Sequence, residues 1–216
     1  MVSELRKKRD EERKLHSREI LLTSAGRIFA SNGYHNTLIS DIVAEGGVGQ
    51  GTFYRHFSSK REVFEIIFDR FMEELLNQFE EMSENLPASL EEYREASLKA
   101  VGRMAALIEK NRDITLMFIR EGASIDREFQ EKIAGMTERF AQLARFYLDH
   151  AVSNGFARPC RSDIVALSLV GMGLQLFDSW GKGLFPSLTV EEIISEAVDF
   201  AFQGLGLHKA EEVPRS

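Results

Sequence analysis

The chain reads TLISDIVAEGGVGQGTFYRHFSSK from Thr37 to Lys60. The first part of this stretch has apolar residues at the three- and four-residue spacing of a helix, and Thr37 is its candidate N-cap. Gly46 and Gly47 end that helix, because glycine adopts left-handed backbone conformations at no steric cost. The stretch therefore predicts two short helices joined by a tight turn, with the second helix starting near Gln50.

The second predicted helix has an apolar side, which carries Phe53 and Phe57, and a side rich in hydrogen-bond donors. A helix of this size fits the major groove of B-form DNA, and helix-turn-helix proteins place their second helix there. Spacing alone also fits any helical hairpin with a polar face. The candidate base readers are Gln50, Thr52 and Arg55, and the candidate phosphate contacts are Tyr54, His56 and Lys60.

The run from Arg18 to Phe64 resembles the DNA-binding domain of the TetR family of transcriptional regulators. The resemblance is strongest in GGVGQGTFYRHFSSKREVF and covers about the first quarter of the chain; beyond it the likeness is architectural. Its motif has a glycine and valine at the turn and a glycine and threonine early in the recognition helix, followed by Tyr54, His56, Phe57 and Lys60.

Two glycines depart from the family's usual pattern. Gly46 stands where the family generally has alanine, and Gly49 stands where it generally has a serine that caps the recognition helix. Glycine is a tolerated cap and its N–H can still point at a phosphate, but the hydroxyl is missing. We expect the DNA-binding residues to be Thr37, Gly49, Gln50, Gly51, Thr52, Tyr54, Arg55, His56 and Lys60.

The resemblance implies an all-α fold of about nine helices. A three-helix N-terminal helix-turn-helix domain is then followed by an all-helical domain that binds a small ligand and dimerises. No segment shows the alternation of a strand. The predicted divisions are a flexible charged arm or frayed helical extension (1–14), the DNA-binding domain (15–61), the ligand-binding and dimerisation domain (62–208) and a disordered tail (209–216).

Capping signals predict several of the later helices. Three boxes of the form Ser/Thr-x-x-Glu begin at Ser59, Ser89 and Thr189, and Ser124 is the expected cap of a long helix that ends at Asn154-Gly155. The helix that begins at Ser59 starts in the DNA-reading domain and continues well beyond it. The domain boundary is therefore expected inside or just before this helix.

The net charge of -7 divides unevenly along the 216 residues. Residues 1–61 hold 11 Lys and Arg against 7 Asp and Glu, whereas residues 62–216 hold 16 against 27. The positive end can neutralise phosphates and release counterions, and the acidic remainder should face away from DNA. A basic N-terminal arm that reaches the minor groove is the alternative to a merely solvated charged segment.

Other functional classes have little support in the sequence. The single cysteine, Cys160, fits a reducing cytosol, and five scattered histidines lack metal-ligand spacing, so no metal or cofactor is expected. The apolar run Ile164–Phe177 is too short to span a bilayer, and no signal peptide precedes it, which favours a cytoplasmic protein without a membrane segment. No local pattern of a nucleophile, a base and an orienting acid favours catalysis.

The last two predicted helices are apolar on more than one side, so each can cover a core and also a two-fold partner, although a monomer with a thick core is the alternative. The TetR resemblance also places a four-helix dimer interface on them. The expected interface residues are Val165, Leu169, Met172, Leu176, Ile194, Val198, Ala201, Phe202 and Leu205.

Aromatic and methionine side chains are frequent on the middle helices, where each alone fits a plain core. As a group, and chiefly through the resemblance, they favour an apolar ligand site. Its expected residues are Met72, Met104, Met117, Phe118, Phe140, Tyr147, Phe177 and Trp180.

The sequence thus predicts a ligand-responsive regulator, most simply a repressor that binds a palindromic operator as a homodimer and is released by a small apolar or amphipathic effector. A constitutive dimeric DNA-binding protein without a ligand is the first alternative. A helical enzyme that uses the N-terminal domain for docking is the remote one. The effector, the operator, the regulated genes, the direction of regulation and the number of dimers per operator are not encoded in these patterns.

Overall fold

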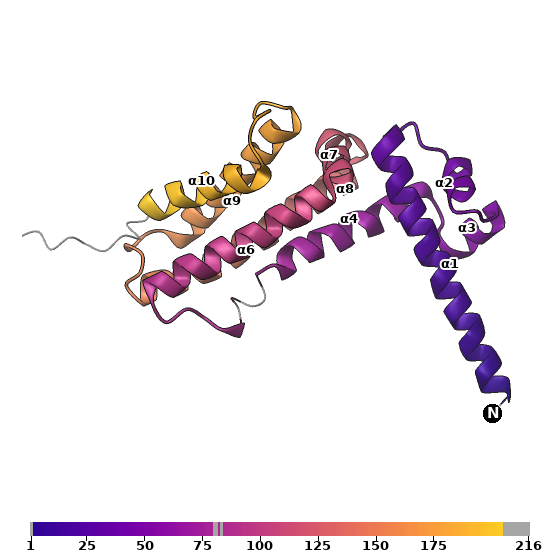
Figure 1. Cartoon of the computed structure of the whole chain (residues 1–216), viewed down its shortest axis with the longest axis horizontal. Coiled ribbons are helices and arrows are strands. Elements are labelled where there is room, and N and C mark those ends of the chain that lie inside the picture. Colours follow the sequence, from indigo (N-terminus) through magenta and orange to yellow (C-terminus); the bar gives the residue numbers. More distant parts are fainter. Residues whose placement is uncertain (1, 80–81, 83, 205–216) are drawn as a thin grey trace, which may run out of the picture. The chain divides into compact units, whose positions relative to one another are not determined.

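The computed structural model describes residues 2–79, 82 and 84–204, and over these residues the chain forms nine α-helices, a short 3-10 turn and no strand (Figure 1). The predicted all-α fold is confirmed. The helices of the N-terminal part are α1 (Val2–Asn32), α2 (Ile39–Glu45), α3 (Gln50–His56) and α4 (Lys60–Asn77). The later elements are α6 (Leu90–Lys110), α7 (Arg112–Glu121), η1 (Gly122–Ser124), α8 (Arg127–Ser153), α9 (Ser162–Gly181) and α10 (Val190–Gly204).

The chain divides into two compact units that are not simple halves of the sequence. The first unit comprises Met1–Glu73 and Arg112–Gln130, and the second comprises Glu74–Asn111 and Glu131–Ser216. The chain passes between the units three times, twice inside a continuous helix, namely α4 and α8. The first boundary, between Glu73 and Glu74, lies inside α4, the helix in which or just before which it is expected, but beyond the predicted division after Arg61. All of α7 also lies in the first unit.

Aromatic packing explains why these later segments join the first unit. Phe64 of α4 lies edge-on to Phe29 of α1, with ring centroids 5.5 Å apart, and to Phe118 of α7 and Phe129 of α8, each at 5.2 Å. Phe29, Phe64 and Phe129 are fully buried, and Phe68 packs against Phe118 and Phe129 in the same way. Edge-to-face ring pairs add to the stabilisation from apolar burial, so α4, α7 and the start of α8 share one core with α1.

A buried turn also fastens the end of α7 to the loop after α1. The Glu121 carboxylate accepts hydrogen bonds from the backbone N–H groups of Tyr34 (2.7 Å) and His35 (3.3 Å). Gly33, with φ 80°, lies directly against that carboxylate, and a Cβ at this position would collide with Oε1. Glycine is therefore required at position 33 for both its backbone conformation and its close approach to Glu121.

The second unit has its own core between α6, α8 and α10. Tyr93, Tyr147, Leu148 and Phe202 are buried there, and Val198 packs against them. The Tyr147 hydroxyl donates to the carbonyl of Phe79 at 2.8 Å, which satisfies its polar end inside an apolar setting. This core fixes which side of α10 faces inward.

The three predicted capping boxes are confirmed by their hydrogen bonds. In each, a glutamate N–H donates to the hydroxyl three residues earlier: Glu62 to Ser59 (3.2 Å), Glu92 to Ser89 (3.2 Å) and Glu192 to Thr189 (3.1 Å). Only the third box also has the reciprocal bond, from the Thr189 N–H to the Glu192 carboxylate at 2.7 Å. In the first two boxes the carboxylate bonds the residue before the cap: Glu62 accepts from the N–H and hydroxyl of Ser58, both at 2.7 Å, and Glu92 accepts from the Ala88 N–H at 2.9 Å. The residues that open α4, α6 and α10 could thus be located from local sequence.

Thr37 is not the cap of α2, contrary to the sequence prediction. It is fully buried, and its hydroxyl donates to the Gly33 carbonyl at 2.6 Å. Leu38 occupies the cap position, where its N–H donates to the Asp41 carboxylate at 2.9 Å. The threonine hydroxyl found a nearer acceptor in the preceding turn, which is the common competition between local side-chain hydrogen bonds and capping.

Ser124 is also not the expected helix cap. It belongs to the 3-10 turn η1, and α8 starts later, at Arg127. The Asp126 carboxylate caps α8 by accepting from the Phe129 N–H at 2.7 Å. An aspartate at this position also complements the positive end of the helix dipole.

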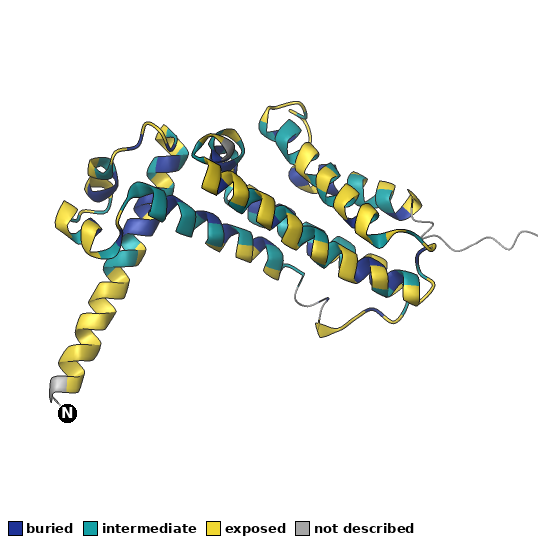
Figure 2. Ribbon diagram, turned by 180° about the vertical axis from the view of Figure 1, so that it is seen from behind, coloured by how far each residue is buried: buried dark blue, intermediate teal, exposed yellow. Residues whose placement is uncertain are grey.

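The N-terminal segment is helical rather than a flexible arm. α1 begins at Val2, and its residues from Glu4 to His16 are all exposed (Figure 2). Glutamate, lysine, arginine and leucine are strong helix formers, so the segment extends α1 without packing against other elements. The predicted tail, residues 209–216, and Leu205 lie outside the described residues.

α9 presents apolar side chains to solvent. Leu167 and Leu174 are 56% and 50% exposed, and Ile164 at the start of α9 is exposed as well. Phe200 of α10 is also exposed. Two of the predicted interface residues, Ile194 and Phe202, are instead buried, because the side of α10 that carries them faces the core of the second unit. The others that the structure describes, on α9 and α10, are half-buried.

α9 is also longer than the apolar run that predicts it. Its 20 residues, Ser162–Gly181, make it the one helix among the described residues that is long and apolar enough to cross a membrane by length and composition. The expectation that this segment is too short for a bilayer is therefore wrong. Its ends are polar positions that the count from Ile164 to Phe177 left out.

Candidate DNA-binding surface

The turn between α2 and α3 has the geometry that its glycines predict. α2 ends at Glu45, Gly46 follows with φ -79°, and Gly47 has φ 62° in the left-handed region. Gly46 is not required by its φ, but a Cβ there would lie 3.2 Å from both Ile20 and Ser24 of α1. The departure from alanine at this position thus accompanies a close approach of the turn to α1.

α3 has the two faces that the sequence predicts. Phe53 and Phe57 are buried, with their ring centroids 5.6 Å apart. Gln50, Tyr54 and Arg55 are exposed. The buried phenylalanines fix the rotation of α3, so its polar residues form a surface open to a partner.

Gly51 lies within α3, where glycine destabilises a helix by roughly 1 kcal/mol relative to alanine. It is exposed, and a Cβ built there would meet no atom within 4 Å. Nothing inside the protein therefore requires glycine at this position. The missing side chain leaves room for a partner to approach the helix backbone at this point, as it also does at Gly102 and Gly135.

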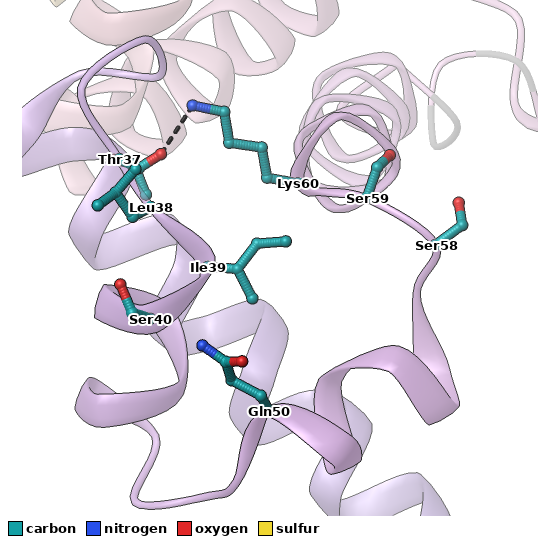
Figure 3. A pocket seen from close by; sticks show the side chains of 8 residues that line it. All are labelled: Thr37, Leu38, Ile39, Ser40, Gln50, Ser58, Ser59 and Lys60. Atoms are coloured by element: carbon teal, nitrogen blue, oxygen red, sulfur yellow. Dashed lines mark hydrogen bonds between the residues drawn. The ribbon is translucent and has the colours of Figure 1, made fainter.

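Lys60 is engaged inside the protein. Its ammonium donates to the backbone carbonyls of Tyr34 (2.7 Å), His35 (3.2 Å) and Thr37 (2.7 Å), and it lies 4.7 Å from the centroid of the Tyr34 ring. Figure 3 shows the bond to Thr37. Burial lowers the pKa of Lys60, which the carboxylate of Glu121 partly opposes. These three acceptors use all three donors of the ammonium, so Lys60 positions the loop after α1 in this structure.

A shallow hollow of about 560 Å³ lies between the N-terminal parts of α2, α3 and α4 (Figure 3). Gln50 enters it from α3, while Ser40 and Ser58 add hydroxyls that the sequence did not single out, and Ser59, predicted only as a helix cap, adds a third. Serines directly before or within the first turn of a helix are the signal that could have found them. The residues that line the hollow are Thr37, Leu38, Ile39, Ser40, Gln50, Ser58, Ser59 and Lys60.

His56 lies among cations at the end of α3. Its Nε2 is 2.7 Å from the Ser17 hydroxyl of α1. Partial burial lowers the pKa of His56, and the charges of Lys14, Arg55 and Arg18 lower it further. Lys14 and Arg18 were not among the predicted DNA-binding residues, since only the tertiary contact between α1 and α3 brings them to His56. Mutual repulsion in such a cluster is relieved when an anion binds.

The predicted ligand residues divide between the two units. Met72, Met117 and Phe118 belong to the first unit, and Met117 and Phe118 are buried in it. The other five residues belong to the second unit, where Tyr147 and Trp180 are buried. Phe118 is part of the aromatic core around Phe64, so at least this residue serves packing.

Comparison with known proteins agrees with this geometry. Residues 21–67 match the family model described as bacterial regulatory proteins, tetR family. A curated relative is the uncharacterized HTH-type transcriptional regulator YhgD of Bacillus subtilis (strain 168). It is 24% identical over 192 residues, which cover 87% of this chain and 96% of that protein.

Two solved structures share the fold over nearly the whole chain. A TetR-family regulator from Syntrophomonas wolfei has a TM-score of 0.69 at 21% identity and covers 90% of this chain and 98% of its own. FadR from Bacillus subtilis, solved in complex with stearoyl-CoA, has a TM-score of 0.73 at 16% identity and covers 86% and 98%. The matched segment coincides with the helix-turn-helix described above, so residues 21–67 form a DNA-binding domain of the TetR family of transcriptional regulators, and the rest of the chain shares the fold of such regulators.

Proposed function

We propose that this regulator is a homodimeric repressor that binds a palindromic operator through α3 and leaves it when a small amphipathic effector binds. The observation that carries the DNA-binding part is the exposed face of α3, where Gly51 has no internal role and cations surround His56. A polar, positively charged helix surface at the edge of a unit is complementary to a DNA groove and its phosphates.

The residues of α3 divide into two roles in this proposal. Gln50 and Arg55 read base edges together with Thr52, since an amide and a guanidinium can each make paired hydrogen bonds to a base. Tyr54, His56 and the Gly49 N–H bind phosphates, and Gly51 allows the backbone to approach the groove. Thr37 and Lys60 act indirectly, because their polar groups already bond to backbone carbonyls of the protein.

The proposed dimer forms through the exposed apolar side of α9. Ile164, Leu167 and Leu174 recur at spacings of three and seven, with Gly171 also exposed between them. A two-fold axis would pair each of these side chains with the same stripe on a second copy, and Phe200 of α10 extends the surface. Among the residues predicted for the interface, the half-buried ones on α9 would flank this stripe.

A membrane is the other medium that an exposed apolar helix fits. We favour the dimer, because a palindromic site needs two copies of α3 and because operator DNA lies in the cytoplasm, where we propose that the protein works. A dimer also buries the apolar side of α9 while the rest of the chain stays in water.

The effector is proposed to be an amphipathic molecule, and an acyl-coenzyme A is the first class to try. The support is indirect: FadR, which shares the fold, was solved with stearoyl-CoA. α4 and α8 each run continuously from one unit into the other. A ligand that changes the second unit can therefore act on the helix-turn-helix through these two helices. The effector then changes the separation of the two recognition helices in the dimer. A dimer that responds to no ligand is the competing hypothesis.

The test uses duplex DNA taken from the region upstream of the protein's own gene. We expect tight binding that weakens steeply with salt, and release of the DNA on addition of stearoyl-CoA, followed by fluorescence anisotropy. Linkage requires that stearoyl-CoA bind less tightly to the DNA complex by the same factor. Binding that ignores stearoyl-CoA and shorter acyl-CoAs would leave the constitutive dimer as the better account, and absence of salt-dependent DNA binding would overturn the proposal.

A further inference from the structure

The exposed N-terminal half of α1 has a side that continues the surface of α3. Ser17 directly follows this exposed half in the sequence. Its contact with His56 identifies the side of α1 that faces the end of α3. Positions 3, 4, 7, 8, 10 and 11 residues before Ser17 lie on or next to the same side, given 3.6 residues per turn. Beyond this point α1 stands clear of the other elements of its unit (Figure 1).

Charge is distributed unequally around this half of α1. The side that faces α3 holds five cations and one acid: Arg6, Lys7, Arg9, Asp10, Arg13 and Lys14. Arg9, eight residues before Ser17, lies as near to it around the helix as Lys7 does, at about 80°. The rest of the exposed segment holds one cation against three acids, with two leucines and a histidine: Glu4, Leu5, Lys8, Glu11, Glu12, Leu15 and His16. A merely solvated helix has no reason to separate its charges in this way.

The cationic side also joins a cluster that already exists in the unit. Lys14 and Arg18 of α1 lie close enough to His56 to act on its charge, together with Arg55 of α3. Cations therefore continue from the end of α3 onto the extension, with Asp10 as the one acid among them. These cations continue the surface of the DNA-reading helix, and their charge is complementary to phosphates. DNA is therefore the partner that fits both α3 and the extension.

We propose that Arg6, Lys7, Arg9, Arg13 and Lys14 form a second DNA-binding surface, which holds phosphates beyond the base pairs that α3 contacts. The inference rests on the proposed DNA-binding function of α3. Ten residues from Ser17 to Lys7 span about 15 Å, which corresponds to roughly four or five base pairs. The extension binds along the backbone and does not enter the minor groove, because a helix is about 10–12 Å across and that groove is only about 6 Å wide.

Two double variants with the same change in net charge test this surface. Lys7→Gln/Lys14→Gln removes two cations from the side that faces α3. Lys8→Gln/Lys110→Gln removes one from the opposite side of α1 and one exposed cation at the end of α6, in the second unit. The probe is a random-sequence duplex of about 40 base pairs, and each full-length protein is titrated at several salt concentrations. We expect the first variant to lower the slope of log affinity against log salt by nearly two, with at least a fivefold loss of affinity at low salt, and the second to match wild type.

A shorter duplex provides the second measurement. On a random duplex of about 16 base pairs, with less DNA beyond α3, the Lys7→Gln/Lys14→Gln variant should lie much closer to wild type. Equal losses in the two double variants, or no loss in either, would overturn the inference. A folding defect is excluded if the helical circular dichroism of both variants matches that of wild type.

The outcomes separate this inference from the function on which it rests. If wild type has no salt-dependent affinity for duplex DNA, the proposed function of α3 fails first. If wild type binds and Arg55→Gln weakens it, but the two double variants behave alike, only the surface on α1 is disproved. Binding of an acidic protein in place of DNA would appear as an intact DNA slope in the Lys7→Gln/Lys14→Gln variant.

Discussion

The exposed sides of α3 and α9 are opposites in chemistry. α3 turns Phe53 and Phe57 inward and leaves Gln50, Tyr54 and Arg55 in water. α9 leaves Leu167 and other large apolar side chains in water, at a free-energy cost of about 25 cal/mol for each Å² of apolar surface. An exposed helix side is accessible to a partner, and the chemistry of its side chains indicates the kind of partner. The polar side of α3 fits a polyanion, and the apolar side of α9 fits another apolar surface.

The largest effect is expected from a charge on the apolar side of α9. Leu167→Glu should convert the dimer into monomers, because an unpaired charge buried in an apolar interface costs several kcal/mol. Sedimentation velocity at micromolar concentration measures this change. Leu184→Glu is the matched control, since Leu184 is an exposed leucine outside α9 and α10 and should leave the dimer intact.

If Leu167→Glu remains dimeric, the dimer interface lies on another surface. The assignment of the exposed side of α9 to self-association is then wrong. Leu174→Glu then serves as a second probe of the same stripe. Loss of the dimer in both variants, with unchanged helical content, would assign the apolar side of α9 to self-association.

Substitutions on α3 should separate base contacts from phosphate contacts. Replacing Gln50 or Arg55 by alanine should change which bases are preferred, with losses of about 1 to 3 kcal/mol where the contact is bidentate. Tyr54→Phe should weaken all duplexes by a similar factor, because a phosphate contact carries no sequence information. Binding to a panel of single-base operator variants gives both results, and a changed preference in Tyr54→Phe would contradict its assignment.

Lys60→Met should lower the free energy of unfolding by about 1 to 3 kcal/mol, because it deprives three backbone carbonyls of a charged donor. Urea denaturation measures this change, and Arg55→Met is a control with a similar stem on an exposed site. A Lys60→Met protein of wild-type stability that had lost DNA affinity would show instead that Lys60 binds phosphate directly.

The smallest effect concerns pH. Burial and nearby cations lower the pKa of His56, so the free protein favours the neutral imidazole, and protonation costs stability as the pH falls below the ordinary value of 6.5. A phosphate at His56 would raise that pKa again, so DNA binding should take up protons. Affinity should therefore increase as the pH falls from about 8 to 6, by less than tenfold per pH unit for one site.

The matched variant His56→Gln should show a flatter dependence of DNA affinity on pH, measured at constant salt. Lys14→Gln should move the midpoint upward, because it removes one of the cations that lower the pKa of His56. A dependence that survives in His56→Gln would assign the titration to another group.

The sequence predicted well where the deciding interactions are local. The turn at Gly46 and Gly47, the two faces of α3 and the three capping boxes each depend on residues within about four positions of one another. Hydrogen-bond partners at such short separations follow from residue type and spacing. The helix-turn-helix and the all-α class could therefore be predicted before any packing was known.

The errors arose where one side chain can bond to several partners, and the sequence cannot rank those partners by distance. Thr37 was predicted as a cap, but the Gly33 carbonyl lay nearer to its hydroxyl. Lys60 is expected at a phosphate, and three carbonyls of the loop after α1 bond its ammonium within the protein, so its phosphate contact stays a prediction for the Lys60→Met variant to test. Spacing shows that such groups are available and does not show which acceptor is closest in space.

The sequence by itself thus determined most of the helices and the reading turn, because backbone propensity, capping and turn chemistry act over a few residues. Only the tertiary structure decided that Arg112–Gln130 joins the DNA-binding unit, that Lys14 and Arg18 lie beside His56, and which side of α9 is left apolar and exposed. Each of these depends on side chains far apart in sequence. Their meeting is set by the packing of whole helices around a shared aromatic core, which no local pattern encodes.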